Sequence, residues 1–246
     1  MPAPPPGWRL RIEEVLPSTS DLLLRLAAAG EPEGLAVLAR RQTAGRGRDG
    51  RLWQSPTGNL YLSLLLRPDA PAREAPAWAL LAAVALAEAL EPSLGDPRAL
   101  RLKWPNDLLL GGAKLAGVLC ESAARSDGRI EWLVIGLGAN LAVAPGLADR
   151  PTACLAGIAP LPESVACQTL HAVEAWRARL RAEGLGSLLA AWQRRGPEPG
   201  APLTLRTGAG ETTGRYRGLD ADGALLLEAE GRVRRFATGE LSTGGD

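Results

Sequence analysis

The spacing of apolar positions divides most of the chain into alternating strands and helices. Apolar and polar residues alternate over 8–15, which is typical of a half-exposed strand, whereas 35–41 and 59–67 are nearly continuous apolar runs that suit buried strands. Residues 75–90 are apolar over a length that favours a buried helix. The full prediction is strands at 8–15, 35–41, 59–67, 98–104, within 111–122 and at 129–141, and helices at 22–29, 75–90, 163–183 and 186–195.

Turn and capping residues separate these elements. Residues 17–21 (Pro-Ser-Thr-Ser-Asp) offer several N-cap candidates before the first helix, which Gly30 closes. Pro105 forces a turn after the strand at 98–104, just before the short apolar run 108–110. Residues 42–58 are dense in Gly and Arg and predict a long loop.

The composition changes at residues 195–200, Arg-Gly-Pro-Glu-Pro-Gly, which indicates a linker. Beyond it come short alternating segments separated by turn signals, a pattern that predicts a small β-barrel. We therefore expect an α+β protein with two domains, residues 1–195 and 196–246. The short segments lie at 201–207, 211–219, 224–230 and 232–238.

Composition narrows the function classes. The formal net charge is +1 and aromatic residues make up 4%, which disfavours a nucleic-acid-binding module built on a wide basic groove with stacking aromatics. The three cysteines form no CxxC pair, so neither a disulfide framework nor a zinc site is expected. The start of the chain has no signal-peptide pattern, and 77–90 is too short for a membrane span, so we expect a cytoplasmic protein.

Residues 45–50 read GRGRDG, a literal match to the G-x-G-x-x-G pattern of dinucleotide-binding folds. That reading needs a helix to open on the last glycine, and Pro56 and Gly58 exclude a continuous helix there. Residues 40–51 instead hold five arginines against one aspartate. Arginine forks and glycine backbone suit phosphate or carboxylate oxygens, so we predict an anion-binding loop, with a solvated surface loop as the alternative.

Lysine and asparagine are rare in this chain. Of its 28 cationic residues only Lys103 and Lys114 are lysines, and the three asparagines are Asn59, Asn106 and Asn140. All five lie between residues 59 and 140, many of them at the ends of predicted strands, where α/β-type folds commonly bind ligands. A compact ammonium can bridge a carboxylate and a phosphate oxygen in a space too tight for a guanidinium.

These motifs together resemble those of biotin protein ligases, in the same order and over nearly the whole chain. Residues 220–242 also resemble the small C-terminal barrel of that family. The core motifs are PSTSD (17–21), RQTAGRGRDGRLW (41–53), NLYLSLLL (59–66), LKWPNDLLL (102–110), KLAGVLCES (114–122) and IGLGANL (135–141).

The resemblance implies a mixed β-sheet flanked by helices, similar to class II aminoacyl-tRNA synthetases, followed by an SH3-like barrel. It implies an enzyme that joins biotin to ATP with Mg²⁺, forming biotinyl-5′-AMP, and passes biotin to a lysine of a biotin carboxyl carrier protein domain. A lipoate or octanoyl ligase or transferase of the same superfamily is the alternative. The chain starts just before its first strand, so we expect no N-terminal DNA-binding domain, no operator binding and no membrane partner; a homodimer is compatible with the sequence.

The resemblance also assigns site residues. The catalytic set is Lys114, Arg48 and Asp107. The biotin set is Ser18, Thr19, Ser20, Gln42, Arg46, Gly47, Arg48, Lys114 and Gly117. The ATP set is Arg51, Trp53, Asn106, Asp107, Gly138 and Asn140, while the magnesium ligands are left open. Ser20 stands where the family usually has Asn, a departure that bears on biotin affinity.

Overall fold

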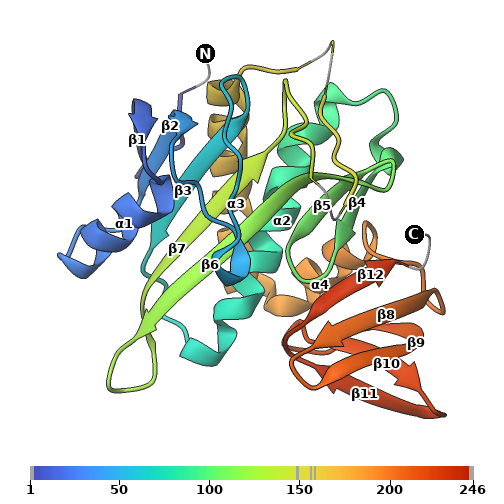
Figure 1. Ribbon diagram of the computed structural model, residues 1–246. Coiled ribbons are helices and arrows are strands. Elements are labelled where there is room, and N and C mark those ends of the chain that lie inside the picture. Colours follow the sequence, from blue (N-terminus) through green and yellow to red (C-terminus); the bar gives the residue numbers. More distant parts are fainter. Residues whose placement is uncertain (1–2, 148–149, 156, 158, 244–246) are drawn as a thin grey trace.

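The computed structural model describes residues 3–147, 150–155, 157 and 159–243, and its strands form two sheets (Figure 1). The larger, seven-stranded sheet has the order β1-β2-β3-β7-β6-β5-β4, in which only β1 and β2 run parallel. Its strands are β1 (Arg9–Leu16), β2 (Leu35–Gln42), β3 (Leu60–Leu66), β4 (Leu100–Lys103), β5 (Asp107–Leu110), β6 (Ala113–Ala124) and β7 (Ile130–Ala139).

Helices cover both faces of this sheet. On one face α1 (Thr19–Ala28) buries Leu23 against Val37, Leu65 and Val134. On the other face α2 (Ala75–Leu90) and α3 (Pro162–Glu183) lie behind the sheet in Figure 1, and α4 (Leu185–Gln193) packs beside them. This arrangement confirms the predicted mixed sheet flanked by helices.

The segment around α2 is the most apolar helical stretch of the described chain. Residues Ala72–Ser93 reach a mean hydropathy of 1.3, long and apolar enough to cross a membrane by length and composition alone. However, 67% of its apolar 18-residue window is buried inside the protein, as expected for the core helix of a globular fold.

The alternation along β3 explains why one face of the sheet holds a cavity as well as a core. Leu60, Leu62, Leu64 and Leu66 all face α2 and α3. The intervening residues face the α1 side, and only Leu65 among them packs beneath that helix. Ser63 lies beyond the start of α1, where a polar side chain can meet the helix N-terminus.

The second sheet is antiparallel and lies beside the β4 and β5 edge of the first, at the lower right of Figure 1. Trp104, in the turn after β4, donates from Nε1 to the Gly223 carbonyl oxygen at 3.1 Å and so joins the two sheets. The order β11-β10-β9-β8-β12 is consistent with the expected SH3-like barrel. Its strands are β8 (Pro202–Thr207), β9 (Gly210–Leu219), β10 (Leu225–Ala229), β11 (Arg232–Phe236) and β12 (Glu240–Thr243).

Three details differ from the prediction. The first helix begins at Thr19 rather than at residue 22, because Ser18 caps it by accepting a hydrogen bond from the Asp21 backbone N–H at 3.2 Å. Asp107, expected in the turn, is the first residue of β5 and pairs with Lys103. Strand β12 was not predicted. The domain division at 195/196 falls within residues 194–201, which join α4 to β8, and stays a prediction.

Candidate active site

Three glycines form the floor of a cavity on the α1 side of the large sheet. Gly117 on β6 pairs with Gly138 on β7, and Gly136 on β7 pairs with Ser63 on β3. Alternate residues of a strand face the same side, so these glycines leave neighbouring positions of that face without side chains. The cavity above them measures about 480 Å³.

The N-terminus of α1 places hydroxyl groups at one end of the cavity. Ser18, Thr19 and Ser20 are all buried and line the cavity wall. Gln42, at the end of β2, accepts at Oε1 from the Thr19 backbone N–H at 2.8 Å and from Thr19 Oγ1 at 3.1 Å. Behind them Ser63 is fully buried. This end of the cavity suits a small polar group with several hydrogen-bonding atoms.

Trp53 covers another part of the glycine floor. A Cβ atom added to Gly138 would lie 2.6–2.8 Å from three atoms of the Trp53 indole, and one added to Gly117 would lie 3.4 Å from that ring. Trp53 is held at this point because its backbone N–H donates to the Gly45 carbonyl oxygen at 2.9 Å. The missing side chains at Gly117 and Gly138 therefore allow the ring to lie against the sheet.

Lys114 lies at the centre of the site, between Asp107 and Trp53. Its Nζ atom is 2.8 Å from Asp107 Oδ1 and 5.5 Å from the centroid of the Trp53 ring. The side chains of Lys114 and Asp107 are only 17% and 12% exposed, so their charges are poorly screened by water. A single ammonium thus faces a carboxylate, an aromatic ring and the open cavity.

The Gly- and Arg-rich loop crosses in front of β6 and closes one side of the cavity (Figure 1). Arg46 Nε lies 2.7 Å from Asp21 Oδ1, and Arg46 Nη2 lies 3.1 Å from Glu121 Oε2. Arg48 Nη1 donates to Asn106 Oδ1 at 3.4 Å and to the carbonyl oxygen of Gly239 at 3.3 Å. The loop is therefore tied to α1, to β6 and to the C-terminal sheet.

Glu240, on β12, brings the C-terminal sheet into the cavity wall. Arg51 forms a two-pronged pair with its carboxylate at 2.9 and 3.1 Å, and Arg150 approaches the same carboxylate at 3.0 Å. The Arg51 hydrogen bond, reinforced by Arg150, lowers the pKa of Glu240 to about 2. Burial lowers the pKa of the nearby Lys103 amine, while Asp107 opposes that shift. Several cations thus surround one anion at this end of the cavity.

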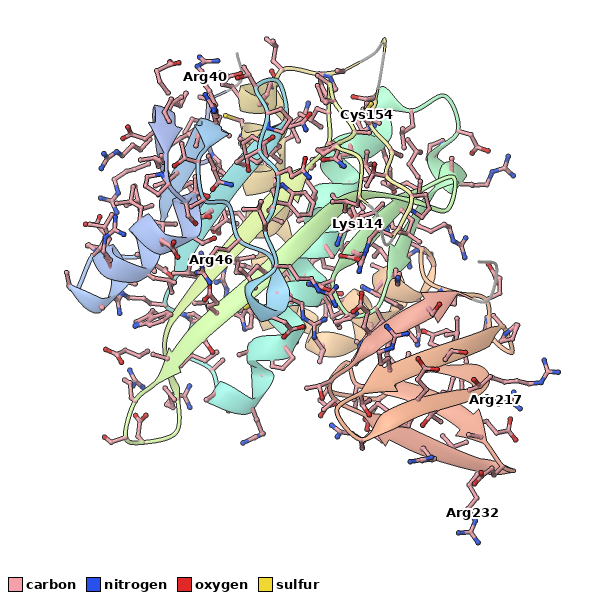
Figure 2. The ribbon with its side chains drawn as sticks, viewed as in Figure 1. Arg40, Arg46, Lys114, Cys154, Arg217 and Arg232 are labelled. Carbon is pink, nitrogen blue, oxygen red and sulfur yellow. The ribbon has the colours of Figure 1, made fainter. Side chains whose placement is uncertain are left out.

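Figure 2 shows how the labelled cations are distributed. Arg46 and Lys114 lie at the front of the large sheet, near the loop and the cavity, whereas Arg217 and Arg232 project from the C-terminal sheet away from it. Cations that gather around the cavity favour an anionic ligand there.

Comparison with protein families gives two matches. Residues 12–140 match the biotin/lipoate A/B protein ligase family, and residues 200–244 match the biotin protein ligase C-terminal domain. The biotin--[acetyl-CoA-carboxylase] ligase of Paracoccus denitrificans is 38% identical over 242 residues, covering 93% of this chain and 98% of the relative. The chain belongs to the biotin/lipoate A/B protein ligase family. Within that family it is an enzyme of the biotin protein ligase type, as the resemblance in the motifs predicted.

Solved structures of biotin protein ligases share this fold. The enzyme from Aquifex aeolicus, solved with biotin and ATP, has a TM-score of 0.78 and 27% identity and covers 95% of this chain and 97% of its own. The enzyme from Leishmania major, solved with biotinyl-5-AMP, has a TM-score of 0.64 and 26% identity over 95% of this chain and 100% of its own. The expected fold class is confirmed.

The structure brings fourteen of the fifteen predicted site residues of this ligase-family chain to the wall of the one 480 Å³ cavity. Asn140 is the exception. It is buried in a smaller neighbouring pocket, where its Nδ2 atom donates to the Lys114 carbonyl oxygen at 3.4 Å. Trp53 and Lys114 line that smaller pocket as well, so the expected place of Asn140 beside the nucleotide stays a prediction.

Five polar residues of the cavity wall were absent from the predicted set of this biotin/lipoate ligase family member. Lys103 was noticed for its rarity and for its place at the end of a predicted strand, but it was not assigned to the site. Arg150 and Glu240 gave no signal, because contact between a connecting loop and a distant strand is a tertiary property. The five residues are Asp49, Tyr61, Lys103, Arg150 and Glu240.

Proposed function

We propose that this chain joins biotin to ATP, forming biotinyl-5′-AMP, and then transfers biotin to a lysine of a biotin carboxyl carrier protein domain. The observation that carries the proposal is the position of Lys114. Its ammonium faces a cavity that has hydroxyl and amide groups at one end and arginines at the other. A ligand with a polar neutral head, an apolar middle and a carboxylate fits between these ends.

Each end of the cavity then has a proposed role. The hydroxyls of Ser18, Thr19 and Ser20, with Gln42, bind the ureido ring of biotin, and the sheet floor around Gly117 and Gly136 contacts its apolar chain. The indole of Trp53 stacks on adenine, an interaction available to any base with a π-face. Asn140 acts indirectly, by holding the backbone of Lys114.

The arginines form the phosphate end of the site. Arg46, Gly47 and Arg48 close over the bound reactants. Arg51, whose guanidinium pairs with the carboxylate of Glu240, meets the triphosphate. Arginine forks match phosphate oxygens in geometry as well as in charge. A closed loop also keeps water from the acyl adenylate.

The reaction needs no nucleophile from the protein. A carboxylate oxygen of biotin attacks the α-phosphorus of ATP, the bond from that phosphorus to the bridging oxygen breaks, and pyrophosphate leaves. In the second step the neutral amine of the carrier lysine attacks the acyl carbon, AMP leaves, and the amine gives up a proton. Lys114 stabilises the charge that builds on the α-phosphate oxygens, which is worth about 3–4 kcal/mol for a well-placed donor.

Magnesium fits this site as an ion carried by the nucleotide. Among the described residues no three His, Cys, Asp or Glu side chains converge, so no protein cage of that kind is present there. Mg²⁺ commonly binds one or two carboxylates together with phosphate oxygens and water. Asp107 is the carboxylate suited to that role, and the ion would offset phosphate charge.

Pyrophosphate release distinguishes a biotin ligase from a lipoate or octanoyl ligase of the same superfamily. The purified chain with ATP and Mg²⁺ should release pyrophosphate in a biotin-dependent manner, and neither lipoate nor octanoate should replace biotin. Release with lipoate or octanoate alone would assign the chain to the other branch. Tight, salt-sensitive RNA binding without any ATP–pyrophosphate exchange would overturn the enzyme assignment.

The remaining partner predictions follow from the same proposal. We place the reaction in the cytoplasm, where the free thiols of Cys120, Cys154 and Cys167 stay reduced. A homodimer and the lack of DNA binding stay predictions. Gel filtration and an operator-binding assay check them.

A further inference from the structure

A row of hydrogen-bonded hydroxyl groups runs behind the polar end of the cavity. Ser20 Oγ lies 3.1 Å from Ser63 Oγ, and Ser63 Oγ lies 2.8 Å from Thr19 Oγ1. Thr19 Oγ1 in turn lies 3.1 Å from Gln42 Oε1. Ser63 does not line the cavity itself, but it joins the two hydroxyls that do.

The direction of every hydrogen bond in this row of hydroxyl groups is determined by Gln42, the residue at its end. Gln42 Oε1 is identified as the carbonyl oxygen because it accepts from the backbone N–H of Thr19 at 2.8 Å. An amide oxygen can only accept, so Thr19 must donate its single hydroxyl proton to it. Ser63 must then donate to Thr19, and Ser20 must donate to Ser63.

The hydroxyls of Thr19 and Ser20 therefore have no protons left for a ligand. Thr19 and Ser20 offer only lone pairs, because each hydroxyl carries one proton and both protons are used. The donors at this end are different groups. Gln42 Nε2 uses one N–H on Ser55 Oγ at 3.1 Å and keeps the second. Ser18 Oγ accepts from Asp21, and no described residue accepts its proton.

We infer that Ser63 is a positioning residue that sets the polarity of this end of the cavity, so that it selects a ring with N–H donors beside a carbonyl acceptor. This inference rests on the proposed function and deepens it, because a cyclic urea is such a ring. The lone pairs of Thr19 and Ser20 accept from the ring N–H groups, and Ser18 and Gln42 donate to the ring carbonyl.

Ser20 fits this polarity as a short residue. A Cβ atom added to Gly136 would lie 2.5 Å from Ser20 Oγ, so the hydroxyl rests directly on the glycine floor. Ser63→Ala would remove the middle hydroxyl of this hydrogen-bonded row. The proton of Ser20 would then be free to turn toward the ligand, and Ser20 would become a donor as well as an acceptor.

Cyclic carbamate analogues of biotin test this inference, because they replace one ureido N–H by a ring oxygen. Both regioisomers are titrated by calorimetry into the full chain without ATP. In the parent chain at least one isomer should bind about 100-fold more weakly than biotin, since its ring oxygen meets lone pairs and leaves them unpaired. In Ser63→Ala biotin should bind about tenfold more weakly, equivalent to one lost hydrogen bond.

The decisive quantity is the ratio of the affinity for biotin to the affinity for the disfavoured carbamate. In Ser63→Ala the preference for biotin over the disfavoured carbamate should fall to less than about tenfold, because the freed Ser20 proton can serve the ring oxygen. Equal weakening of both ligands, with the preference kept, would make Ser63 a merely structural residue and overturn the inference.

A matched control removes another buried hydroxyl away from the cavity. Thr169, on α3, is fully buried, and its Oγ1 atom has no hydrogen-bond partner among the described residues. Thr169→Val should leave both affinities unchanged. If Ser63→Ala does not fold, the parent chain still decides, because equal binding of biotin and both carbamates overturns the inference. Absence of biotin binding by the parent chain overturns the proposed function as well.

Discussion

Lys114 and Asp107 form an ion pair at 2.8 Å, beside the point where β5 and β6 pair and directly above the glycine floor. Asp107 pairs in register with Gly117, and a Cβ atom at that glycine would lie 3.4 Å from Asp107 Oδ1 and 3.5 Å from Lys114 Cε. The space around the ammonium is therefore filled on the sheet side. Only the cavity side is open to a ligand.

This close fit predicts that arginine cannot replace Lys114. In Lys114→Arg the wider guanidinium has to displace Asp107 or Trp53, so its charge leaves the position of the ammonium. We expect biotin-dependent pyrophosphate release to fall by about 100- to 1000-fold. Steady-state kinetics measures it, with Arg98→Lys, an exposed conservative exchange, as the control. Release at the parental rate would remove Lys114 from the chemistry.

The glycine floor predicts a separate effect on the nucleotide. Gly138→Ala would place a methyl group 2.6 Å from the Trp53 indole and tilt the ring away from the sheet. We expect the Kd for ATP to rise about tenfold, as for the loss of one stacked base, with a smaller change for biotin. Gly95→Ala is the matched control, because a Cβ atom there meets nothing within 4 Å. An unchanged Kd for ATP would show that Trp53 does not bind adenine.

The pair between Arg51 and Glu240 predicts a pH-dependent contribution to stability. The pKa of Glu240 falls from 4.5 to about 2 on folding, chiefly through the Arg51 hydrogen bond. A carboxyl with a lowered folded-state pKa stabilises the protein above its unfolded pKa, and this contribution is lost as the pH falls toward 2.

Glu240→Gln should therefore lower the free energy of unfolding by about 1 kcal/mol at pH 7, a figure reduced for solvent screening of a partly exposed pair. The difference from the parent chain should shrink below pH 4.5 and vanish near pH 2. Urea unfolding at several pH values measures it. A constant difference across that range would show that the loss arises from packing and not from charge.

The Gly- and Arg-rich loop should become protected when ligands bind. Its arginines are trypsin sites, and the side chain of Arg51 is 52% exposed. Biotin and ATP together should slow cleavage at this loop, because the loop closes over the reactants. Cleavage after Arg98, whose side chain is 89% exposed, serves as the internal control. Equal rates with and without ligands would contradict loop closure.

Local sequence features accounted for most of the large sheet. Apolar runs and glycine positions depend on neighbours in the chain, so β2, β3 and α2 could be predicted from periodicity. The motif residues also met at one cavity, because several of them end or begin adjacent strands. The start of α1 was misplaced because capping by Ser18 extends the helix into a polar segment.

Long-range contacts could not be predicted from the sequence. Glu240 follows a glycine in an ordinary polar segment, and nothing near it indicates that β12 returns to the loop arginines. Ser63 looked like one polar residue within an apolar strand. Its importance follows from the packing of α1 over β3, which sets it beside Thr19 and Ser20.

Mass measurement of a carrier domain tests the central claim most directly. The parent chain is incubated with ATP, Mg²⁺, biotin and a biotin carboxyl carrier protein domain, alongside Lys114→Arg and a carrier whose acceptor lysine is replaced. The proposed function predicts one added biotinyl group on the intact carrier with the parent chain, and almost none in the other two reactions. An unmodified carrier in the parental reaction, or equal modification by Lys114→Arg, would contradict it.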